Sequence, residues 1–212
     1  MRRTTLPKLW LAAAGLTALC LSLFVSPFDL VAQAPPANPG DVVFNEVAWG
    51  GTAASAADEW IELHNTTDRP IDLANWSLVA VDGAPIISLS GSIPPRGYFL
   101  LERTDDNAVS DIPADLMYTG ALGNGGETLQ LFDAGGVLID SANLNGGPWP
   151  AGSGSPGYYS MERVDPLAPD SAANWASNNG VTRNGLDANG NPINGTPKQP
   201  NSTSIATPTL TP

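Results

Sequence analysis

The stretch DEWIELHN, residues 58–65, holds three carboxylates and the only histidine of the chain. Alternate side chains of a β-strand face opposite sides, so Ile61 and Leu63 share one face of this stretch. Glu62 and His64 share the other face. Two apolar side chains on one side and two polar ones on the other are typical of a half-buried strand. We therefore predict that Ile61 and Leu63 point into a core and that Glu62 and His64 lie on a solvated face.

An enzymatic interpretation of the same stretch pairs Glu62 with His64, as a base and its orienting group or as two metal ligands of a hydrolase. A zinc site needs three or four protein ligands, and the chain has no second histidine. Its only cysteine, Cys20, lies in the amino-terminal apolar run, and no Gly-x-Ser-x-Gly motif is present. We therefore favour the solvated strand face and predict no catalytic residue.

The rest of the chain alternates short apolar stretches with turn residues, and it contains 22 glycines and 20 prolines. No helical period of useful length follows the first 34 residues. This pattern predicts an all-β fold, a sandwich or a barrel. Asp82-Gly83 and Asp133-Ala134-Gly135-Gly136 each predict a hairpin turn. The expected strands lie within residues 42–47, 60–63, 76–81, 86–89, 98–101, 128–132, 137–140 and 158–164, and around Trp175.

The amino-terminal segment has the layout of an export signal. Arg2, Arg3 and Lys8 precede an apolar run over residues 9–25, and Ala32-Gln33-Ala34 supplies a cleavage pattern. We predict that residues 1–34 are a signal peptide, cleaved or retained as an anchor. The protein is then secreted or displayed at the cell surface.

Charge and cysteine content restrict the partners of the exported part. Residues 35–212 carry 6 of the 9 basic and 20 of the 21 acidic side chains, a formal net charge of −14. Such a surface repels phosphates, so we expect no nucleic acid as partner. With no cysteine in this part, disulfides and thiolate chemistry are absent.

Two tryptophans are the candidate binding residues. Trp149 lies between Pro148 and Pro150, and Trp175 lies in a short apolar stretch. An exposed tryptophan ring can stack on a sugar, which is the basis of an alternative function as a carbohydrate-binding module. Burial in the core is the competing interpretation for each, because tryptophan is on average a highly buried residue.

One acidic loop offers weak calcium candidates. Asp187, Asn189 and Asn191 place oxygen ligands at alternate positions, as calcium loops do. Pro192 and Lys198 stand where an EF-hand requires glycine and glutamate, so an EF-hand is excluded. A loop of Asx and glycine turns is the competing interpretation. We expect no cofactor, with a partial calcium site as the alternative.

Three segments together give the chain a family resemblance: WIELHN at 60–65, NWSL at 75–78 and GGETLQLFD at 125–133. Over residues 41–201 the chain resembles the bacterial lamin-tail domain. The resemblance implies an immunoglobulin-like β-sandwich without a catalytic centre of its own. It also implies an exported module of the kind that tethers hydrolases or nucleases to membranes, envelopes or substrates.

These observations define the expected organisation of the chain. Residues 41–145 form the sandwich core, residues 146–201 a loop-rich extension of the same domain, and residues 202–212 a disordered Ser/Thr/Pro tail. The expected function is a non-catalytic interaction or tethering module. Its partner is a protein or an envelope polymer, with a glycan as the alternative.

Overall fold

A computed structural model describes residues 35–204. The predicted signal peptide, residues 1–34, and residues 205–212 of the predicted tail lie outside the described residues. Residues 36–204 belong to one compact unit.

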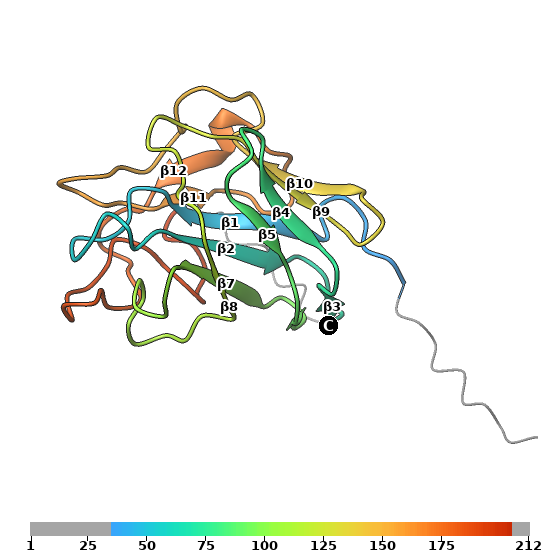
Figure 1. Cartoon of the computed structure of the whole chain (residues 1–212), viewed down its shortest axis with the longest axis horizontal. Helices are drawn as coiled ribbons and strands as arrows, with labels where there is room; N and C mark the ends of the chain where they lie inside the picture. The colour runs from blue at the N-terminus through green and yellow to red at the C-terminus, as the bar shows by residue number, and fades with distance from the viewer. Residues whose placement is uncertain (1–34, 205–212) are drawn as a thin grey trace, which may run out of the picture. The chain divides into compact units, whose positions relative to one another are not determined.

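Two antiparallel-rich sheets form a β-sandwich, and a two-stranded ribbon closes one end (Figure 1). The six-stranded sheet has the order β12-β11-β1-β2-β7-β8, and the four-stranded sheet has the order β10-β9-β4-β5. The strands of the first are β1 Val42–Ala48, β2 Trp60–Asn65, β7 Tyr98–Arg103, β8 Leu116–Tyr118, β11 Met161–Arg163 and β12 Trp175–Ser177. Those of the second are β4 Ser77–Ala80, β5 Ile86–Ser88, β9 Leu129–Phe132 and β10 Leu138–Ala142. The ribbon pairs β3 Ile71–Asp72 with β6 Ser92–Ile93.

The prediction of an all-β, immunoglobulin-like sandwich is confirmed. Every expected apolar stretch contains a strand, and both predicted hairpins are present, β4–β5 and β9–β10. The described residues include one short 3-10 helix, Ala172–Asn174, and no α-helix. Strands β3, β6 and β8 were not expected, because two or three residues are too few to show an alternating pattern.

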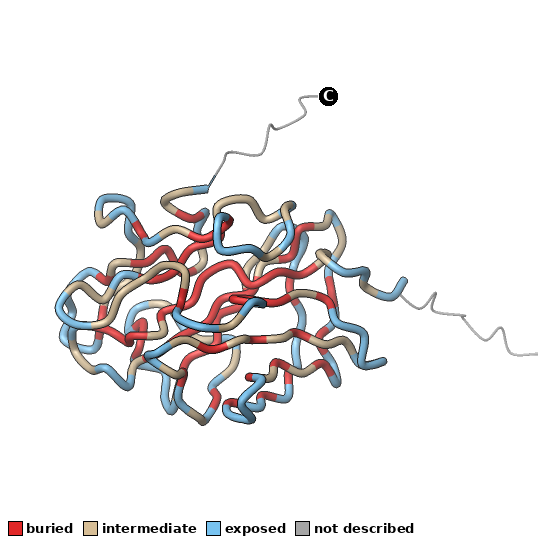
Figure 2. The backbone as a smooth tube through the Cα atoms, turned by 90° about the horizontal axis from the view of Figure 1, so that it is seen from above, coloured by how far each residue is buried: buried red, intermediate tan, exposed pale blue. Residues whose placement is uncertain are grey.

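The main core lies between the two sheets. Ile61 and Leu63 on β2 are fully buried and face Leu78, Leu129 and other side chains of the same apolar cluster. Figure 2 shows buried backbone running through the middle of the domain. The predicted inward face of residues 60–65 is therefore confirmed.

Residues beyond 145 complete the six-stranded sheet. β11 pairs with the edge of β1, with Glu46 opposite Glu162, and β12 pairs with β11, with Arg163 opposite Trp175. The loop-rich extension predicted for residues 146–201 thus contributes two strands to the sandwich itself.

The prediction that Glu62 lies on a solvated face is wrong. Glu62 and Trp60 are almost fully buried, and only His64 is partly exposed. The outer face of the six-stranded sheet is covered by the chain itself, and a second apolar cluster forms there, in which Trp60 and Leu100 contact Val109 and Ile193. A strand that is covered on both faces buries both sets of alternate side chains.

Candidate functional site

Three glutamates form a row across the covered face. Glu162 on β11 lies opposite Glu46 on β1, and Glu46 lies opposite Glu62 on β2. All three side chains are fully buried. Like charges directly opposite each other on a sheet are destabilising, so such a row needs compensating donors or bound protons.

The donors come from the carboxyl-terminal part of the domain. Thr196 donates its backbone N–H to Glu46, and its hydroxyl oxygen lies 2.9 Å from Glu46 Oε2 and 3.1 Å from Glu162 Oε1. A single hydroxyl proton cannot serve both carboxylates. Burial, followed by the charges of Glu162 and Glu62, raises the pKa of Glu46 well above its usual value. The raised pKa favours the protonated carboxyl of Glu46, a form that is able to donate to the hydroxyl oxygen of Thr196.

The other two glutamates are held in the same way. Glu62 accepts from Asn45 Nδ2 at 2.9 Å and from the backbone N–H of Lys198, and burial raises its pKa to about 8. Glu162 accepts from Asn178 Nδ2 at 2.7 Å and from Ser202 Oγ at 2.7 Å. These hydrogen bonds to the three glutamates hold residues 178–203 against the sheet. We call these three residues the glutamate row.

Glu62 and His64 do not form the pair that a hydrolase would need. Both oxygens of Glu62 accept from Asn45 and Lys198, as described above. His64 Nδ1 lies 3.0 Å from the carbonyl oxygen of Gly97, and its ring stacks on Tyr98 with centroids 4.7 Å apart. Burial lowers the pKa of His64, which favours the neutral ring. The two side chains thus serve separate structural contacts.

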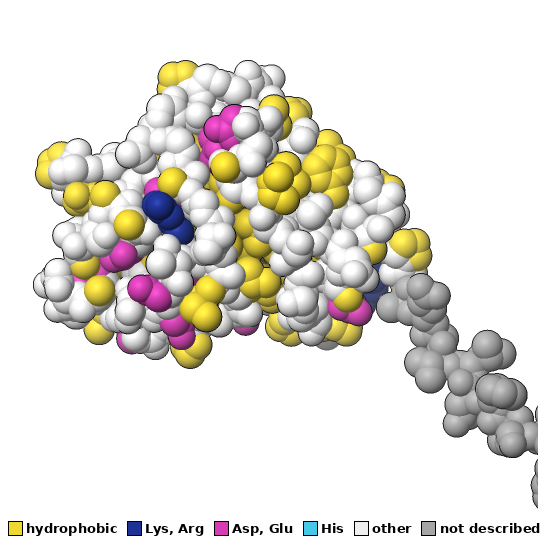
Figure 3. Space-filling view, in the orientation of Figure 1, with side chains coloured by type: hydrophobic (Ala, Val, Ile, Leu, Met, Phe, Trp, Pro, Cys, Tyr) yellow, Lys and Arg dark blue, Asp and Glu magenta, His cyan; other side chains and the backbone are white. Residues whose placement is uncertain are grey.

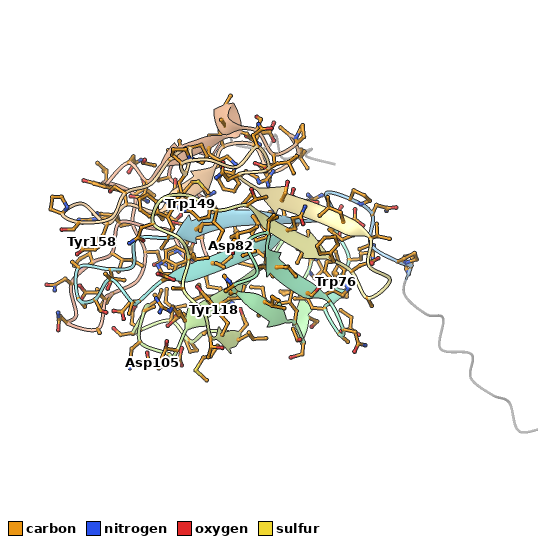
Figure 4. The ribbon with its side chains drawn as sticks, turned by 45° about the horizontal axis from the view of Figure 1, so that its top comes forward. Trp76, Asp82, Asp105, Tyr118, Trp149 and Tyr158 are labelled. Carbon is orange, nitrogen blue, oxygen red and sulfur yellow. The ribbon has the colours of Figure 1, made fainter. Side chains whose placement is uncertain are left out.

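The two candidate binding tryptophans are buried. Trp149, labelled in Figure 4, is 8% exposed and donates its indole N–H to the carbonyl of Gly123 at 2.7 Å. Its ring stacks on that of Trp49. Trp175 is 6% exposed and donates its indole N–H to Asp170 Oδ1 at 2.7 Å. The premise of an exposed ring is therefore wrong for both, and the core interpretation describes them.

The candidate calcium loop uses its carboxylate internally. Asp187 is buried, and its Oδ1 accepts the backbone N–H groups of Asn189 and Asn191, each at 2.9 Å. Within residues 35–204, no three His, Cys, Asp or Glu side chains come together in a way that could hold a metal ion. The geometry is that of an Asx turn. The expectation of no cofactor and its alternative, a partial calcium site, both stay predictions.

The outer face of the four-stranded sheet is not covered in this way. Its outward side chains are uncharged, and all except Ser141 are partly or largely exposed. Ser141, which lies opposite Gln130, is buried and donates its hydroxyl to Asp170 Oδ2 at 3.0 Å. Figure 3, in the view of Figure 1, shows mostly apolar and neutral polar atoms over these strands. Asp140 of β10 turns away to the other sheet, where it binds Arg163 Nη2 at 2.6 Å. This uncharged sheet face consists of Ser77, Val79, Ile86, Ser88, Gln130, Phe132 and Leu138.

Comparison with known families agrees with this architecture. A family model described as Lamin Tail Domain matches residues 35–146, which include strands β1 to β10. The chain belongs to the lamin-tail domain family. The match ends before β11 and β12 of this lamin-tail domain. It also ends before residues 178–203, which supply most of the hydrogen bonds to the glutamate row. No curated protein sequence matches the chain. Residues 35–204 contain no helix with the length and apolar character needed to cross a membrane.

Neither the glutamate row nor the uncharged sheet face was predicted from the sequence. Each of the three glutamates occupies an alternate position of a strand, and a charged residue at such a position normally predicts a solvent-exposed side chain. They are Glu46, Glu62 and Glu162. A usable signal was the lack of any charged residue in SLVA, IIS and LQLF, residues 77–80, 86–88 and 129–132. A solvated face of a sheet normally carries charge, so its absence on neighbouring strands marks a different role.

Proposed function

We propose that this lamin-tail domain is an exported, non-catalytic tethering module that binds a protein or an envelope polymer. The observation that carries the proposal is the contrast between its two outer faces. Residues 178–203, with Ala108 and Val109, cover one face. The outward strand side chains of the other face carry no charge, and most of them are exposed.

The composition of the open face supports a binding role. Residues 35–204 contain 20 acidic side chains, yet none lies on the uncharged sheet face. Ile86 is 65% exposed and Leu138 is 39% exposed. Depletion of charge and exposure of contiguous apolar side chains are features of the central part of protein interfaces.

Export and the choice of partner rest on the sequence. The charged and apolar layout of residues 1–34 supports secretion or surface display. The formal net charge of −14 in residues 35–212 supports partners other than nucleic acid. The buried rings of Trp149 and Trp175 remove the support that an exposed-tryptophan carbohydrate site would have had.

The test is capture of partners from an envelope extract by the immobilised full chain, with two matched variants. Val79→Glu places a charge in the uncharged sheet face, and Val181→Glu places one on a residue that is 85% exposed elsewhere. We expect a partner that the wild type and Val181→Glu retain and that Val79→Glu loses. Thermal unfolding of all three proteins checks that each is folded. Equal capture by both variants, or none by the wild type, would contradict the proposal.

A further inference from the structure

Strand β5 has an open edge beside the uncharged sheet face. β5 is the last strand of its sheet and pairs with β4 on one side. Leu89 donates its N–H to Trp76 at 2.8 Å, and Ala80 donates its N–H to Pro85 at 2.8 Å. In an antiparallel pair such hydrogen-bonded positions alternate with positions whose backbone groups point away. The N–H and C=O groups of Ile86 and Ser88 therefore point away from β4.

This edge lacks the usual protection against pairing. Natural edge strands are blunted by charged side chains or bulges. The opposite edge strand of the same sheet, β10, has both: its register shifts between Leu138 and Asp140, and Asp140 is engaged with Arg163. The β5 segment IIS has no charged side chain, and Ile86 is 65% exposed. β5 retains two protections: it is short, and Gly120 packs against Pro85 just before its first residue, where an added Cβ would lie 3.1 Å from Pro85 Cα.

We propose that β5 binds an extended polypeptide segment of the partner, which pairs with Ile86 and Ser88 as a fifth strand of this sheet. The inference rests on the proposed tethering function and names its mode of contact. In such strand addition the backbone hydrogen bonds supply affinity, and alternate side chains supply specificity. One set of the partner's side chains would extend the uncharged sheet face next to Ile86.

The charge around β5 indicates a basic segment. Asp82 lies in the turn just before β5 and is exposed (Figure 4). Asp72 is exposed and pairs with Ser92, which follows β5. A segment with apolar residues in the middle and lysine or arginine at both ends would match this pattern, and the acidic domain would speed its association.

A second copy of the chain fits this surface less well. Four strands about 4.8 Å apart, each with three to five residues of about 3.3 Å, give a face on the order of 200 Å². A stable interface buries about 800 Å² on each partner. Two copies would also repel each other, because residues 35–212 of each carry a formal net charge of −14. A narrow, extended partner avoids both difficulties.

The probes are three synthetic ten-residue peptides. One has alternating valine and threonine with lysine at both ends, the second has glutamate at both ends, and the third has proline at every second position. Amide hydrogen exchange of the isotope-labelled full chain is measured by NMR with each peptide. We expect the lysine peptide alone to slow exchange of the Ile86 and Ser88 amides by tenfold or more.

Matched variants separate the backbone contact from the side chains. Ser88→Pro removes an outward N–H that β4 does not use, while Ser88→Ala keeps it, so we expect only Ser88→Pro to abolish binding. The double variant Asp72→Lys, Asp82→Lys keeps every backbone donor. It should weaken binding of the lysine peptide at least tenfold and favour the glutamate peptide, which keeps the test decisive if Ser88→Pro does not fold.

Three results would overturn the proposal. They are no protection of Ile86 and Ser88 by the lysine peptide, protection only at another edge, and protection that grows with protein concentration without peptide, which would indicate a second copy. The extract experiment distinguishes this failure from failure of the tethering function. If Val79→Glu loses the partner and Ser88→Pro retains it, the tethering function is supported and strand addition at β5 is excluded.

Discussion

Thr196 binds Glu46 through both its backbone amide and its hydroxyl, at 2.9 Å to Oε1 and 2.9 Å to Oε2. The two residues are 150 positions apart in the sequence. This contact joins the first strand of the sandwich to the end of the domain. Together with the hydroxyl of Ser160, which donates to Oε1, the amide and hydroxyl of Thr196 satisfy the buried carboxyl group of Glu46.

Replacing Thr196 by valine should destabilise the domain. Valine keeps the shape but removes the hydroxyl that lies between Glu46 and Glu162, so a buried carboxyl group loses a partner. An unsatisfied buried polar group costs about 1–3 kcal/mol. Urea unfolding measures the free-energy difference, and Thr182→Val, at an exposed position, is the control with an expected change near zero. Equal stability of the two variants would show that the glutamate row does not fasten the extension.

Stability should fall as pH rises, because burial raises the pKa of Glu62 from 4.5 to about 8. The folded protein then holds a proton that the unfolded chain releases. This contribution is fully present below about pH 4.5 and is lost progressively as pH rises through about 8. Glu46 acts in the same direction. Melting temperatures measured from pH 5 to pH 9 should decrease, and Glu62→Gln should flatten the decrease. A stability that is higher at pH 9 than at pH 5 would contradict the assigned proton.

A methyl group at Gly195 should displace the extension from the sheet. A Cβ atom there would lie 2.6 Å from Cζ2 of Trp60 and 3.0 Å from Glu46 Oε1. Relieving such overlap typically costs 1–3 kcal/mol. Gly125→Ala is the matched control, because nothing lies within 4 Å of its added Cβ. Amide exchange should accelerate across residues 184–203 in Gly195→Ala only. Unchanged exchange in that segment would mean that the close approach is not needed.

The sandwich was predictable from the sequence because its core follows a local rule. Ile61 and Leu63 alternate with polar residues, and Asp82-Gly83 sets a hairpin whose strands pair in the expected order. These signals involve residues that are close in the chain. Within a single strand, this alternation identifies the side chains that face the core. The structure confirms that assignment for Ile61 and Leu63.

The covered face was not predictable in the same way. Glu62 has the sequence context of a solvated strand residue, and its burial depends on Lys198, 136 positions away. No local sequence pattern indicates that a distant segment of the chain packs on the outer face of a sheet. For Trp149 and Trp175 two interpretations stayed open, because the partners that decide between them, Gly123 and Asp170, lie in irregular loops.

Side chains on the two faces of β2 should differ in their effect on stability. Leu63 is fully buried in the main core, and truncating a buried leucine to alanine costs about 2–5 kcal/mol. His64 is partly exposed, so His64→Ala should cost about 1 kcal/mol or less, the value of one ordinary hydrogen bond. Denaturant unfolding compares the two. Any phosphodiesterase or esterase activity that disappears with His64→Ala would revive the hydrolase interpretation.

Arg163 should be the most costly side chain to remove, because it joins the two sheets. Its guanidinium is buried, binds Asp140 at 2.6 Å and the carbonyl of Phe44 at 2.7 Å, and lies 4.9 Å from the ring centroid of Trp175. Arg163→Met would leave Asp140 as a buried carboxylate without its cation, at a cost of about 3–5 kcal/mol. The double variant Arg163→Met, Asp140→Asn removes both charges and should recover part of this loss. If the double variant is as unstable as the sum of the two single variants, the ion pair is not what couples β10 to β11.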